Sequence, residues 1–237
     1  LETERSLKRL GTDWLDILYI HHWDAETPLE ETLAAVDTLV SQGKALYPAV
    51  SNFSAWQTVK ARGVAAAHGY AALAAIQPMY NLVKRTAEIE ILPMAQAEGL
   101  GVFPYSPIGA GLLTGKYHRG ESGRLEASAM YAERYKDPAY RSASAAFVEY
   151  ARERGYSPAA LAVAWVGSHD AVTAPIVGAR SLEQFNDTLG CLDIELSPAE
   201  RAEISVLTPD PPLATDREAM GLTVAQLATG SHTGKAK

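Results

Sequence analysis

A repeated alternation of short apolar runs with helical patterns constrains this 237-residue chain more than any other feature. Strand-like runs are expected at residues 14–20, 45–51, 73–77 and 100–105, with centres about 27 to 30 residues apart. A fifth run is expected at residues 171–177. Strands that alternate with helices predict a parallel sheet, because each helical crossover returns the chain to the same end of the sheet.

Local signals place the helices between these runs. Apolar periodicity predicts helices over about residues 1–10, 29–41, 54–68, 88–98, 142–154, 158–168 and 179–189. Ser54 and Ser157 are expected N-caps, and Ser197 with Pro198 should begin a last short helix. Residues 106–138 interrupt the rhythm with many glycines, and a connection of this length usually has a functional role.

The composition excludes several classes of protein. The formal net charge is -7 and there is no basic stripe, so neither nucleic acid nor an anionic membrane is an expected partner. Cys191 is the single cysteine, which excludes an intrachain disulfide. No apolar run is long enough to span a bilayer and no signal peptide opens the chain, so we expect a cytoplasmic protein.

Polar residues end every one of the five expected strands. The strand ends read His21-His22-Trp23-Asp24, Ser51-Asn52, Gln77-Pro78, Tyr105-Ser106-Pro107 and Gly178-Ala179-Arg180. No glycine-rich phosphate fingerprint follows any strand, which argues against the classical dinucleotide fold. Spacing alone leaves open a doubly wound sheet or part of a barrel, and in a barrel such strand ends carry the active site.

Several blocks in a fixed order resemble the aldo-keto reductase family. LGTDWLDILYIH at residues 10–21 is similar to the signature around the active-site histidine of that family. VSNF at 50–53, QPMYN at 77–81, YSPIGAGLLTGKY at 105–117 and PIVGAR at 175–180 resemble later family blocks. The resemblance covers about residues 7–190 and differs from the family pattern at Leu46, Pro48 and Ala49.

The resemblance implies an α/β fold, a (β/α)8 TIM barrel, of which this chain would hold strands four to eight. Residues 1–209 would form the partial barrel domain, and residues 210–237 a C-terminal tail. It also implies an NADP-dependent oxidoreductase that reduces aldehydes or ketones by hydride transfer. His21 is the expected catalytic residue. It would donate a hydrogen bond to the carbonyl oxygen of the substrate and stabilise the negative charge that develops there.

The cofactor site that the resemblance implies is drawn from all later blocks. Ser51, Asn52 and Gln77 would bind the carboxamide, and Tyr105 would stack on the nicotinamide. Small residues would let the backbone approach the pyrophosphate, with Lys116 supplying charge: Ser106, Pro107, Ile108, Gly109 and Ala110. Arg180, near Gly178, would bind a 2'-phosphate, and Gln184 and Asp187 would lie near the adenosine. Because only NADP carries the 2'-phosphate, Arg180 favours NADP over NAD.

The resemblance implies a small carbonyl compound as the substrate, and nothing in the sequence identifies it further. Trp23 and the loop at 106–138 would shape its pocket, with Tyr131 and Tyr135 as candidate aromatic walls. The family's catalytic tyrosine, lysine and aspartate have no match among these residues. Because the chain also opens on Leu1 within a helical pattern, we expect a fragment, truncated at its N-terminus and inactive as given. The alternatives are a non-catalytic NADP(H)-binding regulatory subunit and an inactive remnant.

Overall fold

The computed structural model describes residues 2–214, which form two compact units. The first unit contains the chain through residue 78 and residues 94–103, and the second contains residues 79–93 and those from 104 onward. Most of the expected C-terminal tail, residues 215–237, lies outside the described residues.

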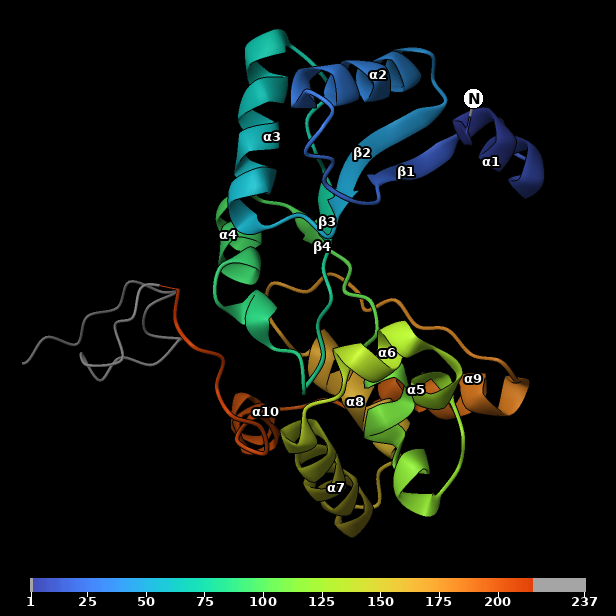
Figure 1. Ribbon diagram of the computed structural model, residues 1–237, viewed down its shortest axis with the longest axis vertical. Helices are drawn as coiled ribbons and strands as arrows, with labels where there is room; N and C mark the ends of the chain where they lie inside the picture. The colour runs from blue at the N-terminus through green and yellow to red at the C-terminus, as the bar shows by residue number, and fades with distance from the viewer. Residues whose placement is uncertain (1, 215–237) are drawn as a thin grey trace, which may run out of the picture. The chain divides into compact units, whose positions relative to one another are not determined.

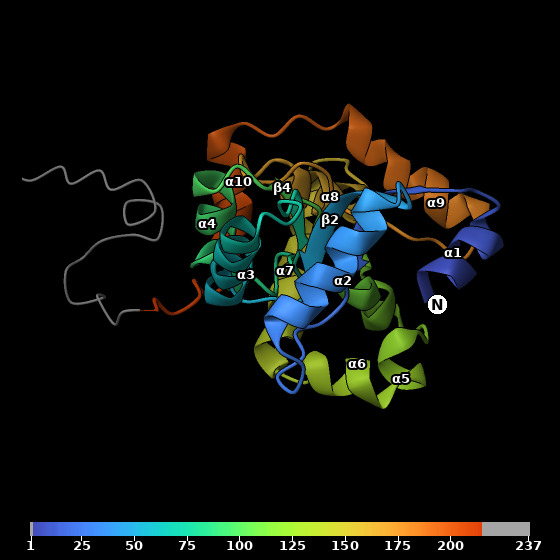
Figure 2. The ribbon, with the colours of Figure 1, turned by 90° about the horizontal axis from the view of Figure 1, so that it is seen from above.

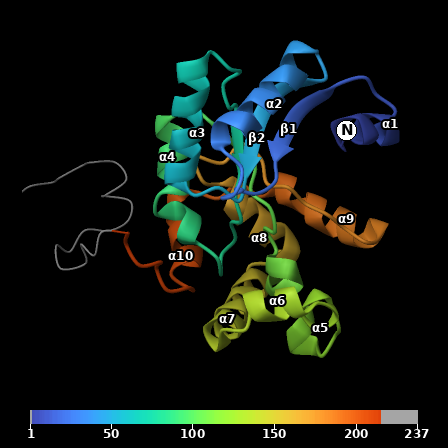
Figure 3. The same cartoon turned by 45° about the horizontal axis from the view of Figure 1, so that its top comes forward.

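The first unit is built on a parallel sheet, as predicted. Its strands are β1 (Leu15–Ile20), β2 (Ala45–Ser51), β3 (Ala75–Gln77) and β4 (Gly101–Val102), in the order β1-β2-β3-β4. Figure 1 shows helices α2 (Leu29–Ser41) and α3 (Ala55–His68) on the same side of these strands, and Figure 3 shows the same arrangement. The remaining helices of this region are α1 (Glu2–Leu10) and α4 (Ile91–Ala97).

The register of the sheet aligns the strand ends. Ile20 pairs with Val50, Val50 pairs with Ile76, and Ile76 pairs with Val102. One row of residues therefore crosses all four strands. The polar residues that come directly after this row must stand side by side at the carboxyl edge of the sheet.

Pro48 is tolerated in the inner strand β2. It has no amide hydrogen, but its carbonyl accepts a hydrogen bond from the amide of Ala74 at 2.9 Å. At this level β3 has not yet begun, since its first residue is Ala75. The ladder thus loses no bond within β3, and Ser51 keeps its pairing with Gln77.

The edge of the sheet at β1 is only partly covered. Among the described residues β1 pairs with β2 alone. Trp14, which precedes β1, is 50% exposed and Tyr47 of β2 is 57% exposed, whereas Ala49 and Val50 are fully buried. The core of the first unit therefore lies along β2 and β3, whereas no residue of β1 is fully buried.

The second unit is mainly helical. Its helices are α5 (Arg124–Ala127), α6 (Ala129–Arg134), α7 (Pro138–Glu153), α8 (Pro158–Gly167), α9 (Leu182–Leu189) and α10 (Pro198–Ser205). Short 3-10 helices lie at η1 (Thr86–Glu88), η2 (Gly109–Thr114), η3 (Lys116–Arg119) and η4 (Gly190–Asp193). Figure 2 shows the chain that leads from the end of α9 to α10.

Helix α8 is the core of the second unit. Ser157 caps it by accepting from the amide of Ala160, and Pro158 is its first residue, as predicted. Every residue from 159 to 166 is buried, so the helix is apolar on all sides and is enclosed by its neighbours η2, α7, α9 and η4.

A buried polar network joins α10 to the segment at 79–93. The Tyr80 hydroxyl donates to Glu88 Oε1 at 2.5 Å, and Arg201 Nη2 donates to the Tyr80 oxygen at 2.7 Å. Glu88 also forms an ion pair with Arg85 at 2.9 Å. Burial raises the pKa of Tyr80 well above its usual value, so its hydroxyl remains a donor.

The fifth expected strand, at residues 171–177, is not a strand in the structure. The segment bonds to the chain after β4 through the Ile176 amide, which donates to the Pro104 carbonyl at 2.8 Å. Pro104 and Pro175 each lack an amide donor, so a regular ladder cannot extend through these positions. Pro104 also explains why the strand expected at 100–105 is only two residues long.

None of the helices in the described part of the chain combines the length and apolar character needed to cross a membrane.

Candidate cofactor site

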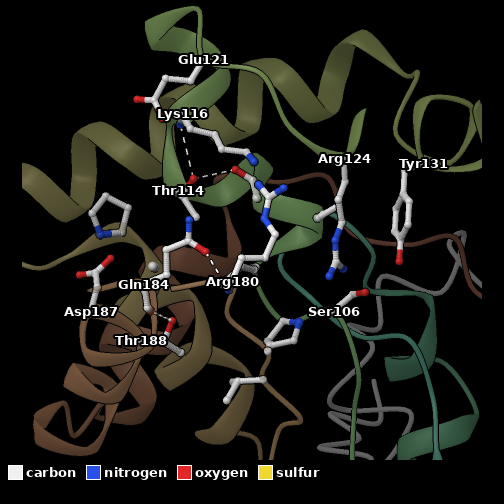
Figure 4. Close-up of a pocket in the computed structure, with 18 of the residues that line it drawn as sticks. Ser106, Thr114, Lys116, Glu121, Arg124, Tyr131, Arg180, Gln184, Asp187 and Thr188 are labelled. Carbon is white, nitrogen blue, oxygen red and sulfur yellow. Dashed lines mark hydrogen bonds between the residues drawn. The ribbon is translucent and has the colours of Figure 1, made fainter. Parts of the chain in front are cut away.

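A cavity of about 900 Å³ lies within the second unit. This volume is in the range of sites that bind cofactors and other small molecules. All the predicted cofactor residues from Tyr105 onward line it except Gly109: they are Tyr105, Ser106, Pro107, Ile108, Ala110, Lys116, Gly178, Arg180, Gln184 and Asp187. Figure 4 shows the labelled polar side chains arranged around this cavity.

One wall is a loop with unusual backbone geometry. Ser106, Gly109, Ala110 and Gly111 have φ values of 59°, 58°, 58° and 91°, all in the left-handed region. Ser106 and Ala110 adopt this conformation at a cost, because their Cβ atoms are crowded there. Tyr105, which precedes the loop, is half-buried, and this burial raises the pKa of its phenol.

Lys116 reaches along this loop because two glycines leave it room. A Cβ atom at Gly111 would lie 2.6 Å from Lys116 Cε, and one at Gly123 would lie 2.1 Å from Lys116 Nζ. The ammonium also sits 4.8 Å from the centre of the Tyr117 ring. Neither glycine could be replaced without moving the lysine, so the path of this cation depends on both.

The opposite wall is the N-terminus of α9. Ser181 caps the helix by accepting from the Gln184 amide at 3.2 Å. The Gln184 side-chain oxygen in turn accepts from the Arg180 backbone amide at 3.2 Å, as Figure 4 shows. Gln184 thus orients the turn that carries Arg180, a role in addition to the adenosine contact expected of it.

Three of the cationic side chains that line the cavity form no ion pair with other described residues. Arg119 is paired with Glu121 at 2.6 Å. Within residues 2–214, Lys116, Arg124 and Arg180 form no ion pair, although Glu183 and Asp187 also line the cavity. Three such cations around a glycine-containing loop form a donor set suited to phosphate groups.

Sequence reasoning did not identify Arg119 and Arg124 as lining residues. Arg124 lies on α5, where its guanidinium stands 5.7 Å from the centre of the Tyr131 ring. The available signal was the presence of basic residues in the glycine-rich segment after Lys116. Of the two tyrosines considered as aromatic walls, Tyr131 lines this cavity, whereas Tyr135 is 2% exposed and is not among the lining residues.

In the first unit, the strand ends bring together His21, Ser51, Asn52 and Gln77. Asn52 Nδ2 donates to the His21 carbonyl at 2.9 Å and to Ser51 Oγ at 3.1 Å. The Ser51 hydroxyl donates to the Gln77 carbonyl at 3.0 Å. These polar groups therefore fix one another's positions along the carboxyl edge of the sheet.

The imidazole of His21 is exposed and contacts its neighbour His22, with ring centres 4.1 Å apart. Tyr19 hydrogen-bonds the side chain of Gln77, and burial raises the pKa of that tyrosine. Within residues 2–214 there is no cluster of three or more His, Cys, Asp or Glu side chains that could hold a metal ion.

Comparison with known proteins identifies the family. The sequence model of the Aldo/keto reductase family matches residues 2–208. The chain is 39% identical over 194 residues to "Uncharacterized oxidoreductase YrpG" of Bacillus subtilis (strain 168), which covers 81% of this chain and 58% of that protein.

Two further relatives have other descriptions. The "Probable voltage-gated potassium channel subunit beta" of Arabidopsis thaliana is 35% identical over 201 residues, covering 81% of this chain and 60% of that protein. The "Probable aryl-alcohol dehydrogenase AAD4" of Saccharomyces cerevisiae is 32% identical over 208 residues, covering 86% and 63%. The chain spans about three-fifths of the length of these relatives.

Proposed function

The chain belongs to the aldo/keto reductase family, and on this premise we propose that it binds NADP(H) and serves the reduction of aldehydes or ketones. The observation that carries the proposal is the cavity of about 900 Å³, walled by the left-handed loop after Tyr105 and by the turn that carries Arg180. Lys116, Arg124 and Arg180 supply positive charge around it.

The residues of each cavity wall are proposed to bind a different part of the cofactor, according to their chemistry. The guanidinium of Arg180 would hold the 2'-phosphate, and Lys116 with the small residues of the loop would hold the pyrophosphate. The Tyr105 ring offers a flat surface for the nicotinamide. When bound, NADPH supplies the hydride.

The strand ends of the first unit are proposed to serve the other end of the reaction. Ser51, Asn52 and Gln77 carry hydroxyl and amide groups that suit a carboxamide. His21 would donate a hydrogen bond to the carbonyl oxygen of the substrate and stabilise negative charge there. The (β/α)8 barrel predicted for residues 1–209 would supply the frame, and four neighbouring parallel strands with helical crossovers support it.

A general acid is also required for carbonyl reduction, and no tyrosine of this chain matches the family position. We therefore expect the 237 residues alone to bind the cofactor and to show no enzymatic turnover. A non-catalytic NADP(H)-binding role is the second candidate, favoured by the 35% identity to a probable potassium channel subunit beta. Turnover in an assay of NADPH oxidation with several aldehydes would favour the reductase over the non-catalytic role.

The cofactor assignment is tested by replacing Arg180 with alanine. Loss of a charge-assisted hydrogen bond of about 1.5 to 3 kcal/mol should weaken NADPH binding about tenfold to hundredfold. NADH lacks the 2'-phosphate, so its affinity should change little. Fluorescence titration of the chain with each cofactor measures both.

Arg152→Ala is the matched control, because Arg152 lies in the last turn of α7 and does not line the cavity. It should leave both affinities unchanged. Equal weakening of NADPH and NADH by Arg180→Ala would remove Arg180 from the phosphate site. Absence of NADPH binding by the unaltered chain would count against the proposed function as a whole.

A further inference from the structure

We propose that Asn81 is a positioning residue that holds Ser106 in its left-handed conformation and so sets the shape of the loop that lines the cavity. The proposal deepens the cofactor site proposed above and rests on it for its functional consequence. Asn81 does not line the cavity, so any effect that it has on a ligand must pass through its neighbours, and among its hydrogen-bond partners Ser106 lines the cavity.

The contacts of Asn81 use both ends of its side-chain amide. The residue is fully buried. Its Nδ2 donates to the Ser106 carbonyl at 2.9 Å and to the Tyr135 hydroxyl oxygen at 3.1 Å. Its Oδ1 accepts from the Val83 amide at 3.2 Å. An amide with two donors and an acceptor meets this set of partners, whereas an aliphatic or a carboxylate side chain does not.

Ser106 is the residue that needs external support. Its φ of 59° is unfavourable for any residue with a Cβ atom. The Ser106 carbonyl accepts from Asn81 on one side and from the Gly109 amide at 3.0 Å on the other. The carbonyl is therefore held between the segment that carries Asn81 and the loop itself.

The same segment fixes the residue before Ser106. The Tyr80 amide donates to the Tyr105 carbonyl at 3.4 Å, and Met79 forms a parallel bridge with Tyr105. Residues 79–81 thus run beside residues 105–106 with consecutive backbone and side-chain bonds. Without the bond from Asn81, backbone pairing with residues 79 and 80 would still hold Tyr105. Ser106, where the turn begins, would lose its hydrogen bond to this segment.

Tyr135 completes the support from a third direction. It accepts the second hydrogen of the Asn81 amide, and its ring carbon Cε1 would lie 3.7 Å from a Cβ atom placed at Gly109. Burial raises the pKa of Tyr135 to about 12, so the phenol is neutral at ordinary pH. Asn81, Tyr135 and the loop therefore interlock without a buried charge.

The experiment compares Asn81→Ala, Ser106→Gly and the double variant in the 237-residue chain. Hydrogen exchange of the amides in residues 105–113 reports the loop without any ligand, and NADPH titration reports the site. Asn81→Ala should speed exchange in this segment and weaken NADPH about tenfold. Glycine adopts positive φ freely, so in the Ser106→Gly background the same change at Asn81 should weaken NADPH by no more than about threefold.

Ser205→Ala is the control for general loss of stability. It removes the 3.1 Å bond from Trp165 Nε1 in the same unit without touching the loop. It should lower the melting temperature and leave exchange in residues 105–113 unchanged. If Asn81→Ala fails to fold, Tyr135→Phe replaces it, and that milder variant should still speed exchange in the loop.

Two outcomes would overturn the role of Asn81. One is unchanged exchange in residues 105–113 in Asn81→Ala, or in Tyr135→Phe where Asn81→Ala does not fold. The other is an effect of Asn81→Ala that is equally large with serine or glycine at position 106. If the unaltered chain does not bind NADPH, the proposed function fails, and the exchange comparison still decides whether Asn81 holds Ser106.

Discussion

Two turns in this protein each contain a non-glycine residue with a left-handed backbone, and the two are stabilised in different ways. Asn52 follows β2 in the first unit and Ser106 follows Tyr105 in the second, and both have left-handed backbones, with φ of 56° and 59°. Asn52 supports itself, because its own side chain donates to the His21 carbonyl. Ser106 is supported by another residue, since Asn81 donates to its carbonyl.

The difference shows how a site can depend on residues that never line it. Asparagine adopts a left-handed backbone more readily than most residues, so the residue itself favours the turn at Asn52, and its bond to the His21 carbonyl adds to that preference. A serine has no such preference, and its turn exists because a buried amide 25 positions earlier in the chain is correctly placed. The first turn positions the strand ends around His21, and the second shapes a cavity wall.

The largest effect expected in this comparison is on turnover, at the first turn. In a form of the protein that reduces an aldehyde, His21→Ala should lower kcat about 10²- to 10³-fold, because the proposed hydrogen-bond donor to the developing oxyanion is lost. NADPH affinity should remain nearly unchanged, since the proposed phosphate contacts lie in the second unit. Steady-state kinetics paired with cofactor titration measures both quantities.

His22→Ala is the matched control, as the two imidazoles are neighbours and both are exposed. It should reduce kcat far less. If His22→Ala lowered kcat strongly and His21→Ala did not, the role proposed for His21 would belong to His22.

A smaller effect is expected on the stability of the self-supporting turn. Asn52→Ala should lower the free energy of unfolding by about 1 to 3 kcal/mol, through the lost bonds to His21 and Ser51 and the cost of alanine at positive φ. Asn52→Gly loses the same bonds but adopts positive φ freely, so it should cost roughly 1 kcal/mol less. Urea unfolding curves compare the two variants. Equal losses would mean that the left-handed backbone contributes nothing to the difference between the turns.

The smallest effect expected is a pH dependence at the externally supported turn. Tyr135 has a folded pKa of about 12, above the usual value near 10, because burial favours the neutral phenol. A raised pKa stabilises the folded state below about pH 10, and that contribution is lost as the pH rises toward 12. The difference between native and Tyr135→Phe proteins should therefore change by about 1 to 2 kcal/mol over this window.

Unfolding free energies measured at about pH 9 and pH 11 provide the test, because these values bracket the usual tyrosine pKa. Other buried phenols, Tyr80 among them, titrate in both proteins and cancel in the difference. A difference that is independent of pH would mean that Tyr135 is ionised as easily in the folded chain as in the unfolded one.

Local signals in the sequence determined much of the first unit and the helix starts. Strand β2 occupies residues 45–51 and α2 occupies residues 29–41, as predicted, because each is specified by its own apolar pattern. Ser54, Ser157 and Ser197 cap the helices that follow them, since a capping side chain needs only the next three residues. The parallel sheet and the polar strand ends follow from the same short-range information.

Tertiary structure decided what depends on residues far apart in the chain. The strand expected at 171–177 is absent because Pro175 within the segment and Pro104 beside it both lack an amide donor, and the segment's own apolar pattern says nothing of Pro104. Arg124 reaches the cavity wall, and Asn81 reaches Ser106, only after separate segments have packed. Local propensity acts over a few residues, whereas the free energy of a buried hydrogen bond depends on where its partner finally lies.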